Sequence, residues 1–248
     1  MKCARILAIS VLVMLLGLPL PDRSWGQASP TPLETVTRAV NAMGGADALR
    51  RLERVTLKGQ AQHWEPDQSY VAGGEARFAG TSTLTVTRDF SGGAARVDWE
   101  RNLVYPGSRV YRYSEVIAGG IGYVQGVDAT ARPARALKTN PPGHSMSGQR
   151  LAAAQRELQR TSPRFLLNML ASPQQLSALP EQHVDARFPA VQFRNGGQTF
   201  TVMFDPETRL PARIRVLDFD NIHGDWPSDV VLSDWRAEGG IKVARQIA

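Results

Sequence analysis

The sequence predicts an α+β fold in which one strongly curved antiparallel sheet, of about nine or ten strands, wraps around central helices. Three observations predict it. Short segments alternate apolar and polar residues with a period of two through most of residues 55–126 and 199–247. A stretch of helical character, residues 147–172, interrupts them. Its second half is apolar nearly all round and must be covered on most sides, and we expect the surrounding sheet to cover it.

The first residues are typical of a secretory signal peptide. A basic start precedes an apolar run from Ile6 to Leu18, and the small-residue pattern Gly26-Gln27-Ala28 follows. The run is shorter than the roughly 20 apolar residues of an ordinary membrane span, and no later segment approaches that length. A retained N-terminal anchor is the alternative. We expect a signal peptide over residues 1–28, a periplasmic or secreted protein, and a single domain over residues 29–248 with no transmembrane span.

Composition and charge narrow the classes of partner. The only cysteine, Cys3, precedes the apolar run, so the mature chain is expected to contain no disulfide. The formal net charge of +6 falls to +4 after cleavage, because the signal peptide carries three basic side chains and one acidic one. There is no basic run and no platform of basic and aromatic residues, so the sequence argues against nucleic-acid binding.

One short helix and five strands are predicted before the central helices. An apolar face over residues 33–43 predicts the helix, which Gly44-Gly45 ends, and residues 46–52 add a further turn. In one of the strands Val97 and Trp99 face one way and charged residues face the other, which is typical of an antiparallel sheet covered on one side. The predicted strands lie near residues 55–61, 80–87, 96–101, 108–117 and 119–126.

The central stretch predicts two helices that meet at a corner. In the first helix, an apolar stripe is expected to lie on the sheet. The faces that carry Arg150, Arg156 and Arg160 are expected to be exposed to solvent. At the corner, Ser162 is expected to cap the second helix and Pro163 to occupy its first position. The stripe consists of Leu151, Ala154 and Leu158.

Strands resume after these helices. Alternation over residues 199–204 and 210–216, separated by a turn at 205–208, predicts a hairpin with one apolar face. A last hairpin is predicted from residues 230–235 and 241–247, which Glu238-Gly239-Gly240 joins.

No catalytic constellation can be assembled from the motifs. Residues 143–147, GHSMS, half-match the G-x-S-x-G nucleophile elbow, but a proline-rich segment precedes them where the elbow needs a buried strand, so a polar loop is favoured over a serine nucleophile. Residues 120–126 have one residue too many for G-x-G-x-x-G and open no helix. His63, His144 and His183 are isolated, so no zinc site can be built from them. We therefore expect no catalytic residue and no cofactor.

A second candidate for chemistry is the acidic segment LDFDNIHGDWPSD, residues 217–229. It could hold a cation through oxygen ligands, but its spacing fits no standard loop. A solvated hairpin tip is the favoured alternative, so no metal ligand is assigned. An independent hydrolase that uses this loop is the remaining hypothesis. The polar residues concerned are Asp218, Asp220, His223, Asp225 and Asp229.

The curved sheet predicts a concave inner surface lined by large apolar side chains. Apolar clefts with a few polar groups are the usual ligand sites, whereas the alternative is that these side chains only pack on the helices. The candidate ligand-binding residues are Trp99, Tyr111, Tyr113, Phe165, Met169, Phe200 and Phe204.

The order of elements, with residues 43–49 (MGGADAL) ending the first helix, resembles the periplasmic carriers of the LolA/LolB lipoprotein-sorting fold. That resemblance implies an unclosed β-barrel that wraps a helical lid and holds acyl chains. Several stretches are also similar to the N-terminal domain that precedes the catalytic domain in some secreted metallo-β-lactamase-fold hydrolases. Those stretches are residues 146–152, 156–163, 200–205, 210–215 and 232–236.

Two function hypotheses follow from this resemblance. The first is a periplasmic non-enzymatic binding module that holds a lipid or other apolar or acyl-chain small molecule in the concave face. The second is an accessory domain whose partner is a hydrolase domain or a downstream protein. The H-x-H-x-D-H metal-binding motif of the hydrolases is absent from the sequence. We therefore expect the catalytic domain to be missing here, and hydrolase activity is not carried over.

Overall fold

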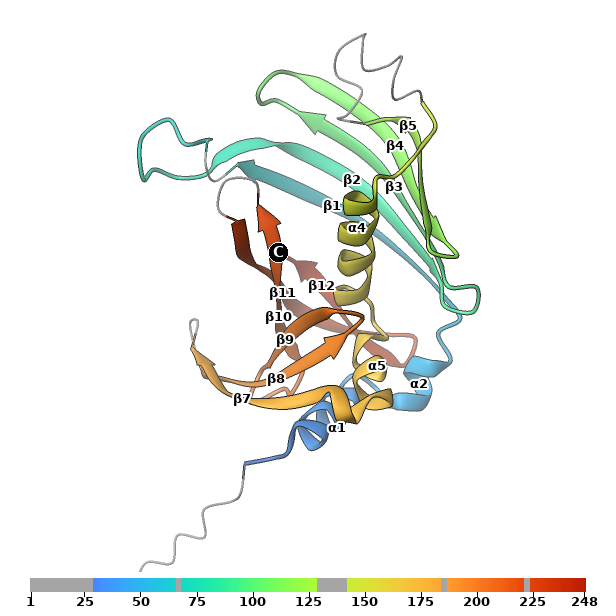
Figure 1. The fold of residues 1–248 in the computed structure, drawn as a ribbon, viewed down its shortest axis with the longest axis vertical. Coiled ribbons are helices and arrows are strands. Elements are labelled where there is room, and N and C mark those ends of the chain that lie inside the picture. The colour runs from blue at the N-terminus through green and yellow to red at the C-terminus, as the bar shows by residue number, and fades with distance from the viewer. Residues whose placement is uncertain (1–28, 66–67, 129–141, 184–186, 221–223) are drawn as a thin grey trace, which may run out of the picture. The chain divides into compact units, whose positions relative to one another are not determined.

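In the computed structural model, the described part of the chain comprises residues 29–65, 68–128, 142–183, 187–220 and 224–248. The predicted signal peptide and His223 lie outside these residues. Within them, twelve strands form two antiparallel sheets of six strands each (Figure 1). The helices lie at the start of the chain and between the two sheets in the sequence. Their bounds are α1 Pro32–Ala42, α2 Ala46–Arg50, α4 Gly148–Arg160, α5 Phe165–Ala171 and the 3-10 turn η3 Pro173–Gln175.

The first sheet contains six consecutive strands, each paired with the next. One face of it carries Leu57, Arg88 and Glu115, because paired residues such as Leu57, Val86 and Val97 point to the same side. The other face carries the threonines of β2. The strands are β1 Arg54–Glu65, β2 Arg77–Asp89, β3 Ala94–Leu103, β4 Arg109–Ala118, β5 Ile121–Val127 and the two-residue β6 His144–Ser145.

The second sheet follows the helices and is built in the same manner, with β7 at one edge and β12 at the other. Its strands are β7 Leu176–His183, β8 Arg187–Asn195, β9 Gln198–Phe204, β10 Pro211–Asp220, β11 Gly224–Glu238 and β12 Ile241–Ile247.

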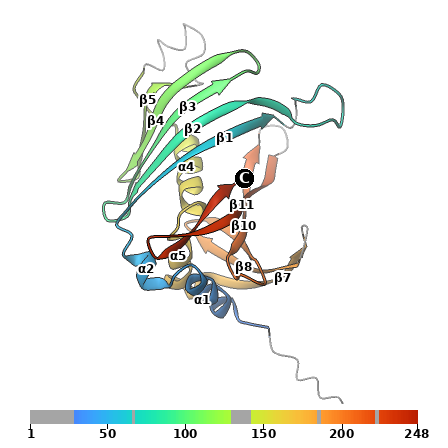
Figure 2. The same ribbon diagram turned by 180° about the vertical axis from the view of Figure 1, so that it is seen from behind.

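The predicted fold class is wrong in its central feature. The described strands do not form one curved sheet of nine or ten strands wrapped around central helices. They form two separate six-stranded sheets, neither of which closes. The apolar helix α5 is buried without an enclosing sheet, because α1 and α2 cover it together with one face of the second sheet. Figure 2 shows α1 and α2 beside α5.

The main hydrophobic core lies on that face of the second sheet. Phe165, Phe193 and Phe200 meet there, with ring centroids of Phe165 and Phe200 5.2 Å apart in an edge-to-face arrangement. Helix α1 contributes an apolar stripe, and its first turn is fixed by a capping box between Thr31 and Glu34. None of the buried residues of this core comes from the first sheet. They lie in α1 and its C-cap Met43, in α2 and α5, and in strands β8, β9, β10 and β12, with Leu210 from the turn before β10.

Arginines of helix α4 bond to both sheets. The prediction that the helix faces carrying these arginines are exposed to solvent is wrong. Arg150 bonds Glu115 of β4, and Arg156 pairs with Asp218 of β10. The Arg160 side chain is only 10% exposed and donates to the carbonyl oxygen of Ser228 in β11. No residue of α4 is fully buried, and the apolar stripe and the arginines have the same intermediate burial. Polar side chains that reach both sheets position this helix.

Arg88 supports the other end of the same helix. It lies on the helix-facing side of β2, 6% exposed, and donates hydrogen bonds to the carbonyl oxygen of Leu158 and to Oγ1 of Thr161. These acceptors belong to the last turn of α4, where carbonyls have no intrahelical partner. Burial lowers the pKa of Arg88 to about 10, so the guanidinium remains charged at neutral pH and complements the negative end of the helix dipole.

The corner after α4 differs in detail from the prediction. Helix α5 begins at Phe165, and its N-cap, Arg164, makes no side-chain cap bond. Ser162 accepts instead from the backbone N–H of Arg164, and its carbonyl accepts from Phe165. Pro163 therefore lies in the turn before the helix and not at its first position.

Strands β7 and β8 were not predicted, and their prolines explain why. Pro180 lies in β7, and a proline cannot donate to a strand neighbour, but β7 is an edge strand and needs donors on one side only. Pro189 lies in β8 opposite an irregular step of the register between Leu179 and Gln182. At both positions the hydrogen-bond ladder of the sheet therefore requires no backbone N–H donor, so a proline is tolerated. The acidic segment is likewise mostly strand, since β10 reaches Asp220 and β11 starts at Gly224.

We expect Asp229→Asn to destabilise the fold at neutral pH by about 1–3 kcal/mol. Asp229 of β11 accepts from Arg213 at 2.6 Å and from Arg215 at 2.7 Å, and the side-chain hydrogen bond from Arg215 is the main cause that lowers its pKa. A lowered carboxyl pKa adds stability above the unfolded value, near 4, and that stability is lost as the pH falls through the folded value.

Urea unfolding at several pH values checks this. The difference in the free energy of unfolding between wild type and Asp229→Asn should be constant near neutral pH and should become smaller below pH 4. The control is Asp47→Asn, whose partner Arg50 is exposed; it should cost well under 1 kcal/mol. A difference that grows in acid would contradict the assignment.

Candidate functional site

The structure divides the seven predicted ligand-binding residues into two groups. Trp99, Tyr111 and Tyr113 lie on the α4-facing side of the first sheet, where Trp99 and Tyr113 stack at 6.4 Å between ring centroids. Trp99 also donates from Nε1 to Glu115. The other four are core residues on the second sheet, each at most 2% exposed. They are Phe165, Met169, Phe200 and Phe204.

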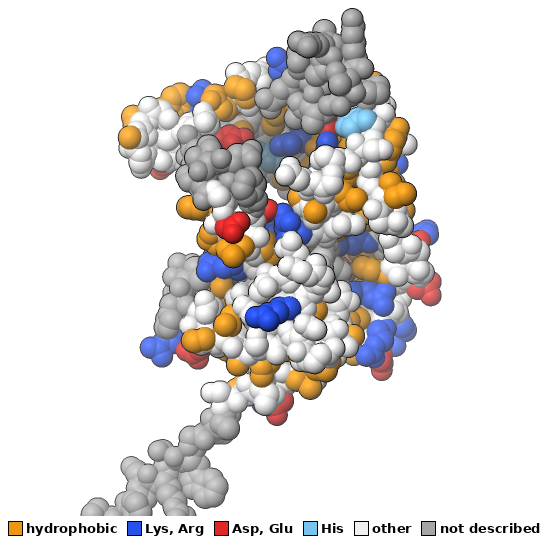
Figure 3. All heavy atoms as spheres, viewed as in Figure 1, with side chains coloured by type: hydrophobic (Ala, Val, Ile, Leu, Met, Phe, Trp, Pro, Cys, Tyr) orange, Lys and Arg blue, Asp and Glu red, His pale blue; other side chains and the backbone are white. Residues whose placement is uncertain are grey.

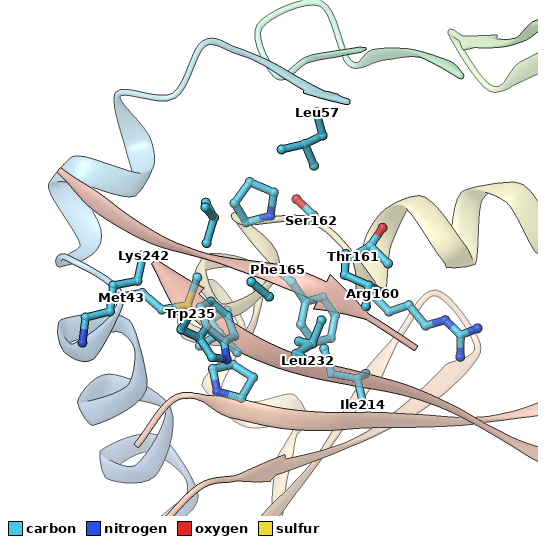
Figure 4. Close-up of a pocket in the computed structure, with 16 residues that line it drawn as sticks. Met43, Leu57, Arg160, Thr161, Ser162, Phe165, Ile214, Leu232, Trp235 and Lys242 are labelled. Atoms are coloured by element: carbon cyan, nitrogen blue, oxygen red, sulfur yellow. The ribbon is translucent and has the colours of Figure 1, made fainter. Parts of the chain in front are cut away.

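An apolar cavity lies where the second group approaches the first sheet. Its floor is formed by Ile214 of β10, Leu232 and Trp235 of β11, and Val243 of β12, while Leu57 of β1 closes it from the opposite side. Figure 4 shows Leu57 projecting from its strand toward Ser162, across from these side chains. Phe165 is the only one of the seven predicted residues that lines it. The lining thus draws on both sheets and on the start of α5.

Two polar residues at the edge of this cavity, Thr161 and Arg160, already have hydrogen-bond partners. Thr161 accepts from Arg88 and donates to the carbonyl of Glu157. The guanidinium of Arg160 points away from the cavity (Figure 4), toward Glu157 and Ser228, so only its aliphatic stem contributes to the wall. A ligand therefore meets mainly hydrocarbon, and neither Thr161 nor Arg160 needs a new hydrogen bond when the cavity fills. Lys242, which also lines the cavity, is exposed to solvent.

The size of the cavity limits what can enter. Its volume is about 50 Å³. A single water occupies at least about 10–15 Å³ on this measure, so the cavity admits a few heavy atoms in line. It matches the end of an acyl chain or a small ring, and not a whole lipid.

Two lining residues, Leu57 and Trp235, lie in predicted strands but are not among the predicted site residues. A single curved sheet predicts neither of them at the site, because they come from different sheets. The β11–β12 hairpin supplies six of the sixteen lining residues. A tryptophan on its apolar face, cross-strand from Ala244, was the available indication.

A second hollow, of about 510 Å³, lies on the opposite face of the first sheet. Its charged lining is internally paired: Arg96 with Asp98 at 2.8 Å and Arg112 with Glu100 at 3.0 Å. Ser114 donates to Asp98 and accepts from Arg96. This surface offers neither an apolar wall nor an unpaired charge, so it is the weaker candidate.

The acidic segment does not gather its side chains at one point. Asp218 pairs with Arg156 of α4, whereas Asp229 is held by arginines of β10. Among the residues that the structure describes, no three histidine, cysteine or acidic side chains are grouped to hold a metal ion (Figure 3 shows the acidic and histidine side chains on one face). Half of the nucleophile-elbow motif forms β6, which pairs with β5, and Ser147 caps α4.

A scan against protein-family models finds no matching family, and comparisons with curated proteins and with solved structures give no match either. In the described part of the chain, none of the helices has both the length and the apolar character that a membrane crossing requires.

Proposed function

We propose that this chain is a non-enzymatic binding module that takes the apolar end of a small amphiphile, such as an acyl chain, into the cavity between Leu57, the start of α5 and the β11–β12 hairpin. The observation that carries the proposal is a cavity walled mainly by hydrocarbon, at whose edge Thr161 and Arg160 are already hydrogen-bonded. Burying a methylene there gains about 0.8 kcal/mol, with no polar group desolvated in exchange.

The proposal moves the ligand from the concave face of a single sheet to the space between two sheets. It retains the ligand class that the sequence indicated. Cleavage of the predicted signal peptide would make the module periplasmic or secreted, a setting in which free acyl chains need a carrier. The polar end of the amphiphile would remain in water at the mouth of the cavity.

We expect Ala244→Leu to weaken ligand binding by at least about tenfold, equivalent to 1.4 kcal/mol. Ala244 lines the cavity, cross-strand from Trp235, and three added carbons occupy space that the ligand would use. Titration with a dansyl-labelled fatty acid measures it: fluorescence should rise saturably with wild type and far less with the variant.

Ala237→Leu is the matched control. Ala237 is exposed on the same hairpin and is not part of the cavity wall. Its variant should bind as wild type does. The proposal is overturned if wild type binds no fatty acid, or if the two leucine variants bind with equal affinity.

A further inference from the structure

The α4-facing side of the first sheet holds a group of polar side chains outside the apolar cavity, here named the Arg101 cluster. Ser82, Arg101 and Tyr111 are direct neighbours across β2, β3 and β4, and paired residues share one face. His63 of β1 joins Ser82 at 2.6 Å between Nε2 and Oγ. Tyr113 follows Tyr111 on the same face.

Arg101 has no carboxylate partner in the described part of the chain, although most arginines of the interior have one. Its Nε is buried and makes no hydrogen bond. The nearby Glu115 is engaged by Arg150 and accepts from Trp99. Arg150 also bonds the buried Asp128, so acidic side chains lie near Arg101 as well. What distinguishes Arg101 is its unbonded Nε and not an excess of positive charge.

Tyr111 gives an independent indication of a missing acceptor. The side chain is only 4% exposed, and its hydroxyl is buried without a hydrogen-bond partner. Leaving such a group unpaired costs about 1–3 kcal/mol, so native structures rarely do so away from a site of function. The buried hydroxyl and the buried Nε belong to residues that face each other across β3 and β4.

The other members of the cluster complement an anion. Burial is the main cause that lowers the pKa of His63, with the charge of Arg101 next, so the ring is neutral near pH 7 and adds no charge to the cluster. Burial raises the pKa of Tyr113, so its phenol stays protonated and can donate.

We infer that Arg101, Tyr111 and Tyr113 form a binding site for a small oxyanion, a carboxylate or a phosphate group. The planar guanidinium donates to oxygens of such a group in pairs, and the two phenols supply further donors. The inference does not rest on the proposed acyl-chain cavity, whose lining shares none of these residues.

Nuclear magnetic resonance titration of the full chain tests the site. The probes are sodium acetate and inorganic phosphate, each compared with sodium chloride at equal ionic strength, and the signal is the Nε–Hε resonance of Arg101. We expect a saturable shift with at least one oxyanion and none with chloride. A shift with acetate alone assigns a carboxylate ligand, and a shift with phosphate alone assigns a phosphate ligand. Either result supports the site, as does a shift with both anions.

Three variants complete the test, followed through backbone amide shifts of β3 and β4. Arg101→Gln should weaken binding by at least about tenfold. Tyr111→Phe, which removes one oxygen and keeps the ring, should weaken it by about three- to tenfold. Arg194→Gln removes the same charge from an exposed position on β8 and should bind as wild type. No saturable shift in wild type, or equal weakening by Arg194→Gln, would overturn the inference.

Discussion

Gly44→Ala is expected to lower the free energy of unfolding by about 2–5 kcal/mol. Gly44 follows α1 with a φ of +116°, where L side chains are strained. A Cβ there would lie 2.5 Å from the carbonyl oxygen of Gly240 and 3.1 Å from Cα of Ile241, and both are backbone atoms that cannot rotate aside. The clash would also disturb the hydrogen bond from the Lys242 N–H to the Met43 carbonyl, 2.8 Å long.

The adjacent residue provides the control for this experiment. Gly45 also has a positive φ, +92°, but a Cβ on it meets nothing within 4 Å. Gly45→Ala should therefore show the backbone strain without the clash, about 1–3 kcal/mol. Urea denaturation of both variants gives the comparison. If Gly44→Ala were no worse than Gly45→Ala, the close approach of α1 to the β11–β12 hairpin would be wrong.

Phe200→Ala is expected to cost about 3–5 kcal/mol, since the side chain is fully buried and nothing can collapse into the space. Its ring contacts Phe165 of α5 and Phe193 of β8, so its loss opens a void at the junction of helix and sheet. The melting temperature and the urea midpoint should both fall.

Phe78→Ala is the matched control on the first sheet. Phe78 is 36% exposed and touches Trp64 at the surface, so its removal should cost about 1 kcal/mol or less. Equal losses for the two variants would show that the second sheet does not hold the main core. If the Phe200→Ala variant were unfolded, the loss of stability would be larger than expected but in the predicted direction.

Much of the local structure could be predicted from the sequence. Alternation located most strands, including β3, where Val97 is buried and Arg96 exposed. The double glycine after α1 marked its end, and the helix does end there. These features are decided by neighbours in the chain, through the period of the pattern and the backbone conformations that glycine permits.

The assembly of the candidate site could not be predicted, because its lining residues come from segments that are far apart in the sequence. Nothing in the pattern around Leu57 shows that it will face Trp235. The arginines of α4 looked solvated because their partners, such as Glu115 and Asp218, are about 35 and 62 positions away. A local sequence pattern predicts that charged side chains are exposed to solvent, whereas pairing with residues far away in the chain can bury them.

The sequence by itself determined the helices and most of the strands, though not β7 and β8, and it determined which residues are apolar and that α5 must be covered. Only the tertiary structure decided that twelve strands divide into two sheets, that α1 and α2 share the covering of α5, and that an apolar cavity and the Arg101 cluster lie at separate places. The physical reason is that periodicity is set within a few residues, while the choice of which apolar faces meet depends on packing and charge pairing across the whole chain.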